Sequence, residues 1–169
     1  MTAENRLYAD LKALSIAFAV TEHEAVFTVE QSQRIDRELP GAHTKNLFLK
    51  DAGGQFWLVT VPATARVDLK ALPAAIGSKK LSFGKPEDME RLLGVSPGSV
   101  TPLAAINDIR REVRIVLDDG LAGADQINVH PLRNTATMTL ASAELIAALT
   151  SWGHPPHIAS LPVLETQHV

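Results

Sequence analysis

The chain has 169 residues and a formal net charge of −3; 46% of its residues are hydrophobic and 21% are charged. This length predicts a single domain over residues 1–169, with about 161–169 expected to fray at the C-terminus. The chain contains no cysteine, which excludes disulfides, thiolate metal ligands and cysteine nucleophiles. No stretch approaches the ~20 apolar residues of a membrane span or resembles a signal peptide, so we expect a cytoplasmic protein that does not enter membranes. The acidic net charge argues against a general DNA-binding protein.

Helix and strand signals alternate along the first half of the chain. Leucines at helical spacing predict a first helix over residues 4–14. Thr28 and Gln31 have the spacing of a capping box, so a second helix should begin at Val29 and end near Leu39. The other elements expected here are strands over residues 17–21, 47–49 and 56–61, the last two joined by a hairpin turn at Gly53-Gly54.

Proline and glycine mark the elements of the second half. A helix over residues 68–76 should break at Pro73, whereas one over 86–93 has Pro86 at its start and Gly94 just past its end. The remaining expected elements are strands over 81–83, 113–117, 126–129 and 136–140, a turn at 118–120, and a last helix over 143–150 with Ser142 as its N-cap. Interspersed strands and helices with at least one hairpin predict an α+β domain built on a mixed sheet.

The chain lacks the motifs of several enzyme classes. It contains no Gly-x-Ser-x-Gly nucleophile elbow and no glycine-rich loop with the Lys-Ser/Thr ending of a nucleotide triphosphatase. Its six histidines include no His-Glu-x-x-His pattern or other zinc spacing, so we expect no metal site.

Three polar features are candidates for a site, and each also has a structural explanation. Lys45 opens an apolar strand and could serve only to discourage edge pairing, while His130 is held extended by Pro131 and could simply bond a loop carbonyl. Residues 94–102 hold two glycines and two prolines, a composition suited either to a rigid ligand-facing loop or to a surface turn. Six basic residues could contact an RNA end or form a solvated face: Arg110, Arg111, Arg114, Lys79, Lys80 and Lys85.

Three separated motifs give the chain a family resemblance from about residue 21 to 153. They read Thr-Lys-Asn-Leu-Phe-Leu at 44–49, Pro-Gly-Ser-Val at 97–100 and His-Pro-x-x-Asn-Thr-Ala-Thr at 130–137. In this order they resemble the YbaK/prolyl-tRNA-synthetase-associated family of aminoacyl-tRNA deacylases. The resemblance implies the fold of that family, a mixed and mostly antiparallel sheet with surrounding helices in one domain.

The resemblance also implies an activity and a set of site residues. Within the family the motifs look most like the freestanding branch that removes alanine from tRNA(Pro), with Asn46 favouring this branch over the one that deacylates Cys-tRNA. By analogy Lys45, Asn46 and His130 are the catalytic residues, and a hydroxyl of the terminal ribose activates the water. Substrate-binding residues are expected in the other two motifs: Gly98, Ser99, Asn134 and Thr135.

The family analogy implies no metal or other cofactor. The expected partners are the acceptor end of tRNA(Pro) and prolyl-tRNA synthetase. Two alternatives stay open: a deacylase for another small amino acid, such as Cys- or Ser-tRNA, and a non-catalytic module that binds tRNA or another nucleic acid.

Overall fold

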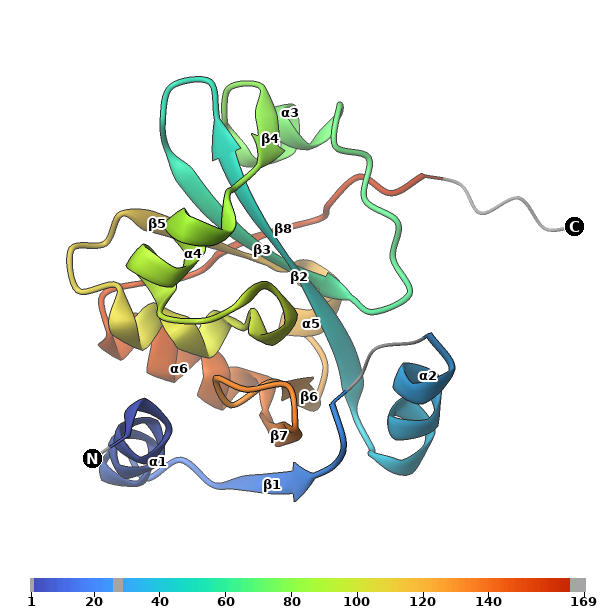
Figure 1. The fold of residues 1–169 in the computed structure, drawn as a ribbon. Coiled ribbons are helices and arrows are strands. Elements are labelled where there is room, and N and C mark those ends of the chain that lie inside the picture. Colours follow the sequence, from blue (N-terminus) through green and yellow to red (C-terminus); the bar gives the residue numbers. More distant parts are fainter. Residues whose placement is uncertain (1, 26–28, 165–169) are drawn as a thin grey trace, which may run out of the picture.

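The computed structural model describes residues 2–25 and 29–164, which fold around one mixed eight-stranded sheet (Figure 1). The strands are β1 (Phe18–Glu22), β2 (Ala42–Asp51), β3 (Phe56–Pro62), β4 (Leu81–Phe83), β5 (Val113–Asp118), β6 (Gln126–Val129), β7 (Ala136–Ala141) and β8 (His157–Ala159). Their order is β1-β7-β6-β2-β3-β5-β8, with β4 pairing β2. Four pairings are antiparallel (β1/β7, β6/β7, β2/β3, β2/β4) and three are parallel (β2/β6, β3/β5, β5/β8). The predicted α+β fold on a mixed, mostly antiparallel sheet is confirmed.

Strand β2 runs through the centre of the molecule and joins the two halves of the sheet. It pairs with β3 from Thr44 to Lys50, and Gly54, with φ of 89°, turns the chain back after it. On its other edge, β6 pairs only with Ala42 and His43, and β4 only with the last three residues, Leu49 to Asp51. No described strand therefore pairs with that edge between residues 44 and 48.

Six helices surround the sheet in the described part of the chain: α1 (Ala3–Ala13), α2 (Val29–Glu38), α3 (Leu72–Ile76), α4 (Pro86–Leu93), α5 (Asp119–Ala122) and α6 (Ser142–Ser151). The bounds of α4 are those predicted, with Gly94 left-handed at its C-cap, and α1 and α2 lie within a residue of their predicted bounds. Thr28 is outside the described residues, so the capping box stays a prediction. None of the described helices is long and apolar enough to cross a membrane.

Three sequence predictions about element boundaries were wrong. Helix α3 begins only at Leu72, which places Pro73 in the first turn. N–H groups in the first turn have no hydrogen-bond acceptor within the helix, so the missing N–H of a proline costs nothing there. Ser142 is not an N-cap but the first residue of α6, after Ala141. Residues 118–120 do not form a separate turn but begin the short helix α5. Asp118 is its N-cap, and the Asp118 side chain accepts a 3.0 Å hydrogen bond from the Gly120 N–H. Strand β8 was not predicted.

Each face of the sheet has its own core. The larger core packs α1, α4, α6 and the 3₁₀ segments Pro97–Ser99 and Pro102–Asn107 against one face; α1, α4 and α6 lie together to one side of β2 in Figure 1, with α2 on the other. A smaller core on the opposite face includes Trp57, Leu72 and Leu161. Residues 161–164 are thus part of the packed structure: Leu161 is buried and the Leu164 N–H donates to the Arg66 carbonyl at 2.7 Å.

Candidate active site

The half of the sheet formed by β1, β7, β6 and β2 has one apolar and one polar face. Paired residues on neighbouring strands share a face, so His43, Asn128 and Thr139 lie in one row. His130, two residues after Asn128, and Thr137, two residues before Thr139, lie on the same face of the sheet. The opposite face carries buried apolar residues of the larger core: Ile127, Val129, Met138 and Leu140. The polar row faces away from that core.

A cavity of about 80 Å³ lies between the polar face and α2. It is lined by His23, Ser32, Ile35, Asp36, His43, Thr44, Asn128, Val129, His130 and Thr137. Because a water molecule in the liquid occupies ~30 Å³, this space holds two or three waters or a small organic group. The cavity therefore suits a small substrate moiety.

His130 presents an unbonded ring nitrogen in this cavity. Its Nδ1 lies 3.1 Å from the Ala136 carbonyl, which only accepts hydrogen bonds, so Nδ1 carries the proton. Burial lowers the pKa of His130 below its ordinary value; the hydrogen bond to Ala136 opposes the shift and the charge of nearby His23 adds to it. His130 is therefore neutral at pH 7, and within the described structure its Nε2 has no bonded partner, so the Nε2 lone pair can accept a proton or a hydrogen bond.

Lys45 lies beside this cavity on the same face of the sheet. It follows His43 by two residues, and if the parallel register that pairs His43 with Asn128 is continued by two residues, Lys45 is level with His130. The side chain is half-buried, and its ammonium group has no hydrogen bond or ion pair with any described residue. A cation so placed is available to an incoming anion or a developing negative charge.

Asn46 points to the opposite face, and its amide is engaged by the protein. Its Oδ1 accepts a 2.6 Å hydrogen bond from the Thr60 hydroxyl, and its Nδ2 donates to the Val100 carbonyl at 3.1 Å. Asn46 therefore ties β2 to β3 and to the loop of residues 94–102.

That loop meets the segment that follows His130. A Cβ atom added to Gly98 would lie 3.2 Å from Asn134 Nδ2, so the Pro-Gly-Ser-Val and Asn-Thr motifs adjoin. Ser99 is buried, with its hydroxyl 3.5 Å from that of Ser96. The hydroxyl of Thr135 accepts a 2.8 Å hydrogen bond from Arg133, a residue that also pairs with two glutamates. The structure thus brings the three motifs together around the edge of β2 that no strand covers.

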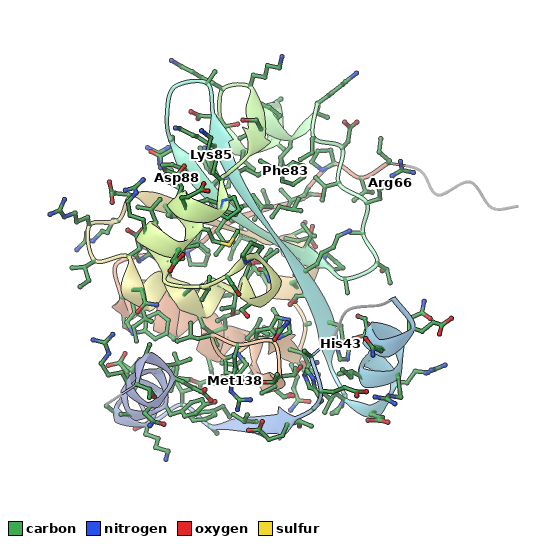
Figure 2. The ribbon with its side chains drawn as sticks, in the orientation of Figure 1. His43, Arg66, Phe83, Lys85, Asp88 and Met138 are labelled. Atoms are coloured by element: carbon green, nitrogen blue, oxygen red, sulfur yellow. The ribbon has the colours of Figure 1, made fainter. Side chains whose placement is uncertain are left out.

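Besides His130, the cavity has three ionisable lining residues, none of which was expected from the sequence: His23, Asp36 and His43. The Nε2 atom of His23 lies 2.8 Å from the Thr137 hydroxyl. His43 Nδ1 lies 3.0 Å from Asp36 Oδ1, which links β2 to α2, and Figure 2 shows His43 between these two elements. Alternation along the strand could have shown that His43 shares a face with Lys45, but not that α2 covers that face. Across residues 2–25 and 29–164, no group of three or more His, Asp or Glu side chains could hold a metal ion.

Comparisons with known proteins show the family of the chain. Residues 23–148 match the family model of the aminoacyl-tRNA editing domain. The chain is 38% identical over 146 residues to the prolyl-tRNA editing protein ProX of Acetoanaerobium sticklandii, covering 86% of this chain and 89% of the relative. It is 39% identical over 153 residues to the prolyl-tRNA synthetase associated domain-containing protein 1 of Bos taurus, covering 88% and 89%.

A solved structure shows the same fold. A crystal structure described as that of a candidate trans-editing enzyme for prolyl tRNA synthetase superposes with a TM-score of 0.71 at 22% sequence identity, covering 96% of this chain and 98% of that one. The family match spans most of the chain, and the motifs on which the resemblance rested meet at one site. The chain therefore belongs to the aminoacyl-tRNA editing domain family and is an aminoacyl-tRNA hydrolase.

Proposed function

We propose that the protein hydrolyses the ester of alanine mischarged onto tRNA(Pro). The observation that carries this proposal is the 80 Å³ cavity beside Lys45 and His130. A synthetase pocket that holds proline also admits alanine, because missing methylenes cost only about 1–3 kcal/mol of discrimination in an apolar pocket. A second and smaller pocket corrects that error when it accepts alanine and excludes proline by size. Ile35 of α2 supplies an apolar wall for a methyl group.

In the proposed reaction, water attacks the ester carbonyl that links the amino acid to the terminal ribose. The carbonyl oxygen gains negative charge, which the Lys45 ammonium stabilises. The bond from the carbonyl carbon to the ribose oxygen then breaks, the ribose oxygen takes up a proton, and alanine and tRNA are released. His130 Nε2 accepts a hydrogen bond from the neighbouring ribose hydroxyl and so orients the group that activates the water.

The other motif residues shape the site. Asn46 acts as a positioning residue, because its amide holds the Val100 carbonyl and with it the loop that carries Gly98 and Ser99. In our proposal this loop and the adjoining Asn134 and Thr135 form the wall against which the amino acid and the terminal nucleotide lie.

A panel of charged tRNAs tests this proposal. Ala-, Cys-, Ser- and Pro-tRNA(Pro) are incubated with wild type, Lys45→Ala and Lys50→Ala, and the remaining ester is measured over time. Lys50 is a matched control, because it is an exposed lysine of the same strand on the opposite face. We expect Ala-tRNA(Pro) to be hydrolysed fastest, and Lys45→Ala to lose about 10²- to 10³-fold in kcat, the range for removing one donor to a developing oxyanion.

Three results would contradict the proposal or a part of it. Faster hydrolysis of Cys- or Ser-tRNA would assign a different substrate, and binding of tRNA without hydrolysis of any ester would leave a binding module. Unchanged deacylation in Lys45→Ala would remove Lys45 from the mechanism.

The proposal also implies a cellular setting. The substrate arises when prolyl-tRNA synthetase releases Ala-tRNA(Pro), so we propose that the protein works in the cytoplasm and receives its substrate from that synthetase. Co-sedimentation of the purified protein with prolyl-tRNA synthetase, with and without tRNA(Pro), measures whether the two associate directly.

A further inference from the structure

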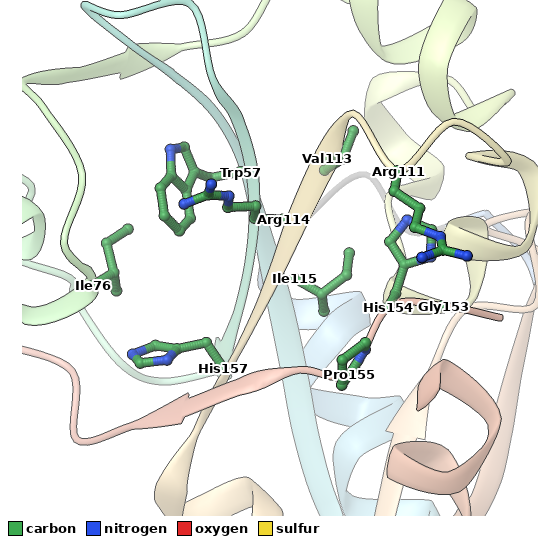
Figure 3. A pocket seen from close by; sticks show the side chains of 10 residues that line it. All are labelled: Trp57, Ile76, Arg111, Val113, Arg114, Ile115, Gly153, His154, Pro155 and His157. Atoms are coloured by element: carbon green, nitrogen blue, oxygen red, sulfur yellow. The ribbon is translucent and has the colours of Figure 1, made fainter. Parts of the chain in front are cut away.

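A second and larger cavity, of about 280 Å³, opens at the β5 edge of the sheet (Figure 3). Its lining residues are Trp57, Ile76, Arg111, Val113, Arg114, Ile115, Gly153, His154, Pro155 and His157. It shares none of these with the cavity under α2. It exists because β8 pairs with β5 only from Val116 onward; Pro155 and Pro156, which precede β8, have no N–H groups to continue the ladder.

The charge of this cavity is one-sided. Two arginines and two histidines line it, and none of its ten lining residues is acidic, in a chain whose net charge is −3. The Arg111 guanidinium has no hydrogen bond or ion pair with any described residue. The guanidinium of Arg114 lies 5.4 Å from the centre of the Trp57 ring, and Figure 3 shows the two side chains together. This contact orients the Arg114 guanidinium and leaves its N–H groups available.

The buried Asp108 carboxylate, which bonds the lining residue His154, does not neutralise these arginines. Asp108 accepts hydrogen bonds from the Val113 N–H at 2.8 Å, the Glu112 N–H at 3.1 Å and His154 Nε2 at 2.9 Å. Its oxygens are therefore used to hold the loop before β5 and the histidine at the back of the cavity. The charge of Arg111 and Arg114 stays free for a ligand.

The backbone at Arg111 supports a role beyond folding. Arg111 has φ of 57°, in the left-handed region, which costs a residue other than glycine of order 1–3 kcal/mol. The Arg111 N–H donates to the Asp108 carbonyl at 3.1 Å, which holds this turn. An exposed residue kept in a strained conformation, with an unpaired guanidinium at a cavity, is a candidate for ligand binding.

We propose that this cavity binds a phosphate-bearing ligand through Arg111 and Arg114, which lie on opposite sides of it in Figure 3. A guanidinium offers paired N–H donors that match phosphate oxygens in a two-pronged geometry. The volume is close to the lower end of small-ligand sites, ~300 Å³, and has room for a phosphate with part of its nucleoside. His157, exposed at the rim, adds a ring that can bond or stack on that nucleoside.

The phosphate has two possible sources. If the proposed function is correct, the phosphate is a phosphodiester of the bound tRNA. Arg114 lies on the same face of the sheet as Lys45, two strands across and four residues along. With ~4.8 Å between strands and a rise of ~3.3 Å per residue, the two residues are ~16 Å apart. That distance is about five steps of ~3.4 Å along a nucleic-acid strand. Otherwise the source is a free nucleotide.

The experiment compares wild type, Arg111→Gln/Arg114→Gln, the charge-keeping Arg111→Lys/Arg114→Lys, and Arg110→Gln. Arg110 is a matched control, because it is an exposed neighbouring arginine that lines a different cavity. Calorimetry with inorganic phosphate and AMP measures free ligands, and fluorescence anisotropy with uncharged tRNA(Pro) measures affinity as a function of salt. Thermal unfolding shows that each variant is folded, and the charge-keeping variant should retain part of the binding.

Either source gives a distinct result. If the phosphate belongs to tRNA, the double Gln variant binds tRNA about 10-fold more weakly and its slope of log affinity against log salt is smaller by about 1, while kcat for the ester is unchanged. If it belongs to a free nucleotide, AMP binds wild type and Arg110→Gln but not the double Gln variant, and tRNA affinity is unchanged. The proposal is overturned if wild type binds neither phosphate nor AMP and the double Gln variant binds tRNA like wild type.

These measurements are independent of ester hydrolysis. If wild type leaves every charged tRNA intact, the proposed function fails, whereas the calorimetry and the binding of uncharged tRNA still report on Arg111 and Arg114.

Discussion

Replacing Asn46 by alanine should destabilise the fold as well as slow deacylation, because the Asn46 amide joins three segments. Thr60 is fully buried, and its hydroxyl donates to Asn46 Oδ1 at 2.6 Å. The Val100 carbonyl, on a residue that is 7% exposed, accepts from Asn46 Nδ2 at 3.1 Å. The alanine variant therefore leaves both the Thr60 hydroxyl and the Val100 carbonyl without this partner.

The expected cost follows from the two buried groups left behind. A buried donor or acceptor that loses its partner costs about 1–3 kcal/mol, and a carbonyl at a loop finds water more easily than a hydroxyl inside a sheet. We therefore expect Asn46→Ala to lower the free energy of unfolding by about 2–4 kcal/mol. For a chain of this length that corresponds to a fall in Tm of about 5–15 °C.

Urea unfolding of a double-mutant cycle measures the effect. Thr60→Val removes the donor and leaves Asn46 Oδ1 without it, so this single change should also destabilise. Asn46→Ala/Thr60→Val should cost about 1 kcal/mol less than the two single costs added together, because the hydrogen bond can be lost only once. Asn46→Asp should be destabilising too, since a carboxylate can accept from Thr60 but cannot donate to Val100.

The reasoning is refuted if Asn46→Ala unfolds at the same urea concentration as wild type, or if the two single costs add without coupling. Loss of deacylation at unchanged stability would instead show that Asn46 contacts the substrate directly.

Three other changes have defined outcomes. Asp108→Ala should cost about 3–5 kcal/mol in urea unfolding, because it leaves His154, which is 5% exposed, without its carboxylate partner; unchanged stability would show that the pair contributes nothing. The folded-state pKa of His130 lies below the ordinary 6.5, so protonation favours the unfolded chain, and the stability lost on going from pH 7 to pH 5 should be smaller in His130→Asn; an equal or larger loss in that variant would contradict the shift. Ser142 Oγ is the one buried side-chain N or O atom without a hydrogen-bond partner among the described residues, so Ser142→Ala should leave the Tm unchanged or raise it by a few degrees, and a clear fall would reveal a missed partner.

Elements with their own boundary residues could be predicted from the sequence. Helix α4 has a proline in its first turn and a left-handed glycine at its end, and the β2–β3 hairpin has Gly54 in its turn. These signals act within a few residues, so they hold wherever the segment is packed. Strand β8 has only three residues after two prolines, and only its parallel pairing with β5 makes it a strand.

The candidate site was predictable as three motifs but not as an arrangement. Family resemblance pointed to Lys45 and His130, yet nothing near either residue shows that they share a face. That depends on the pairing of His43 with Asn128, residues separated by 85 positions. The pairing of β2 with β3 sets Asn46 opposite Thr60, and alternation along β2 turns its side chain away from Lys45, so that its amide bonds Thr60 and Val100.

The sequence by itself determined the elements with local signals, the amphipathic helices and the family to which the motifs belong. The tertiary structure alone decided which polar side chains meet: His23, Asp36 and His43 at the small cavity, and Arg111 and Arg114 at the larger one. The physical reason is that helix caps and turns satisfy hydrogen bonds within a few residues, whereas sheet register and the packing of α2 are set by contacts between distant segments.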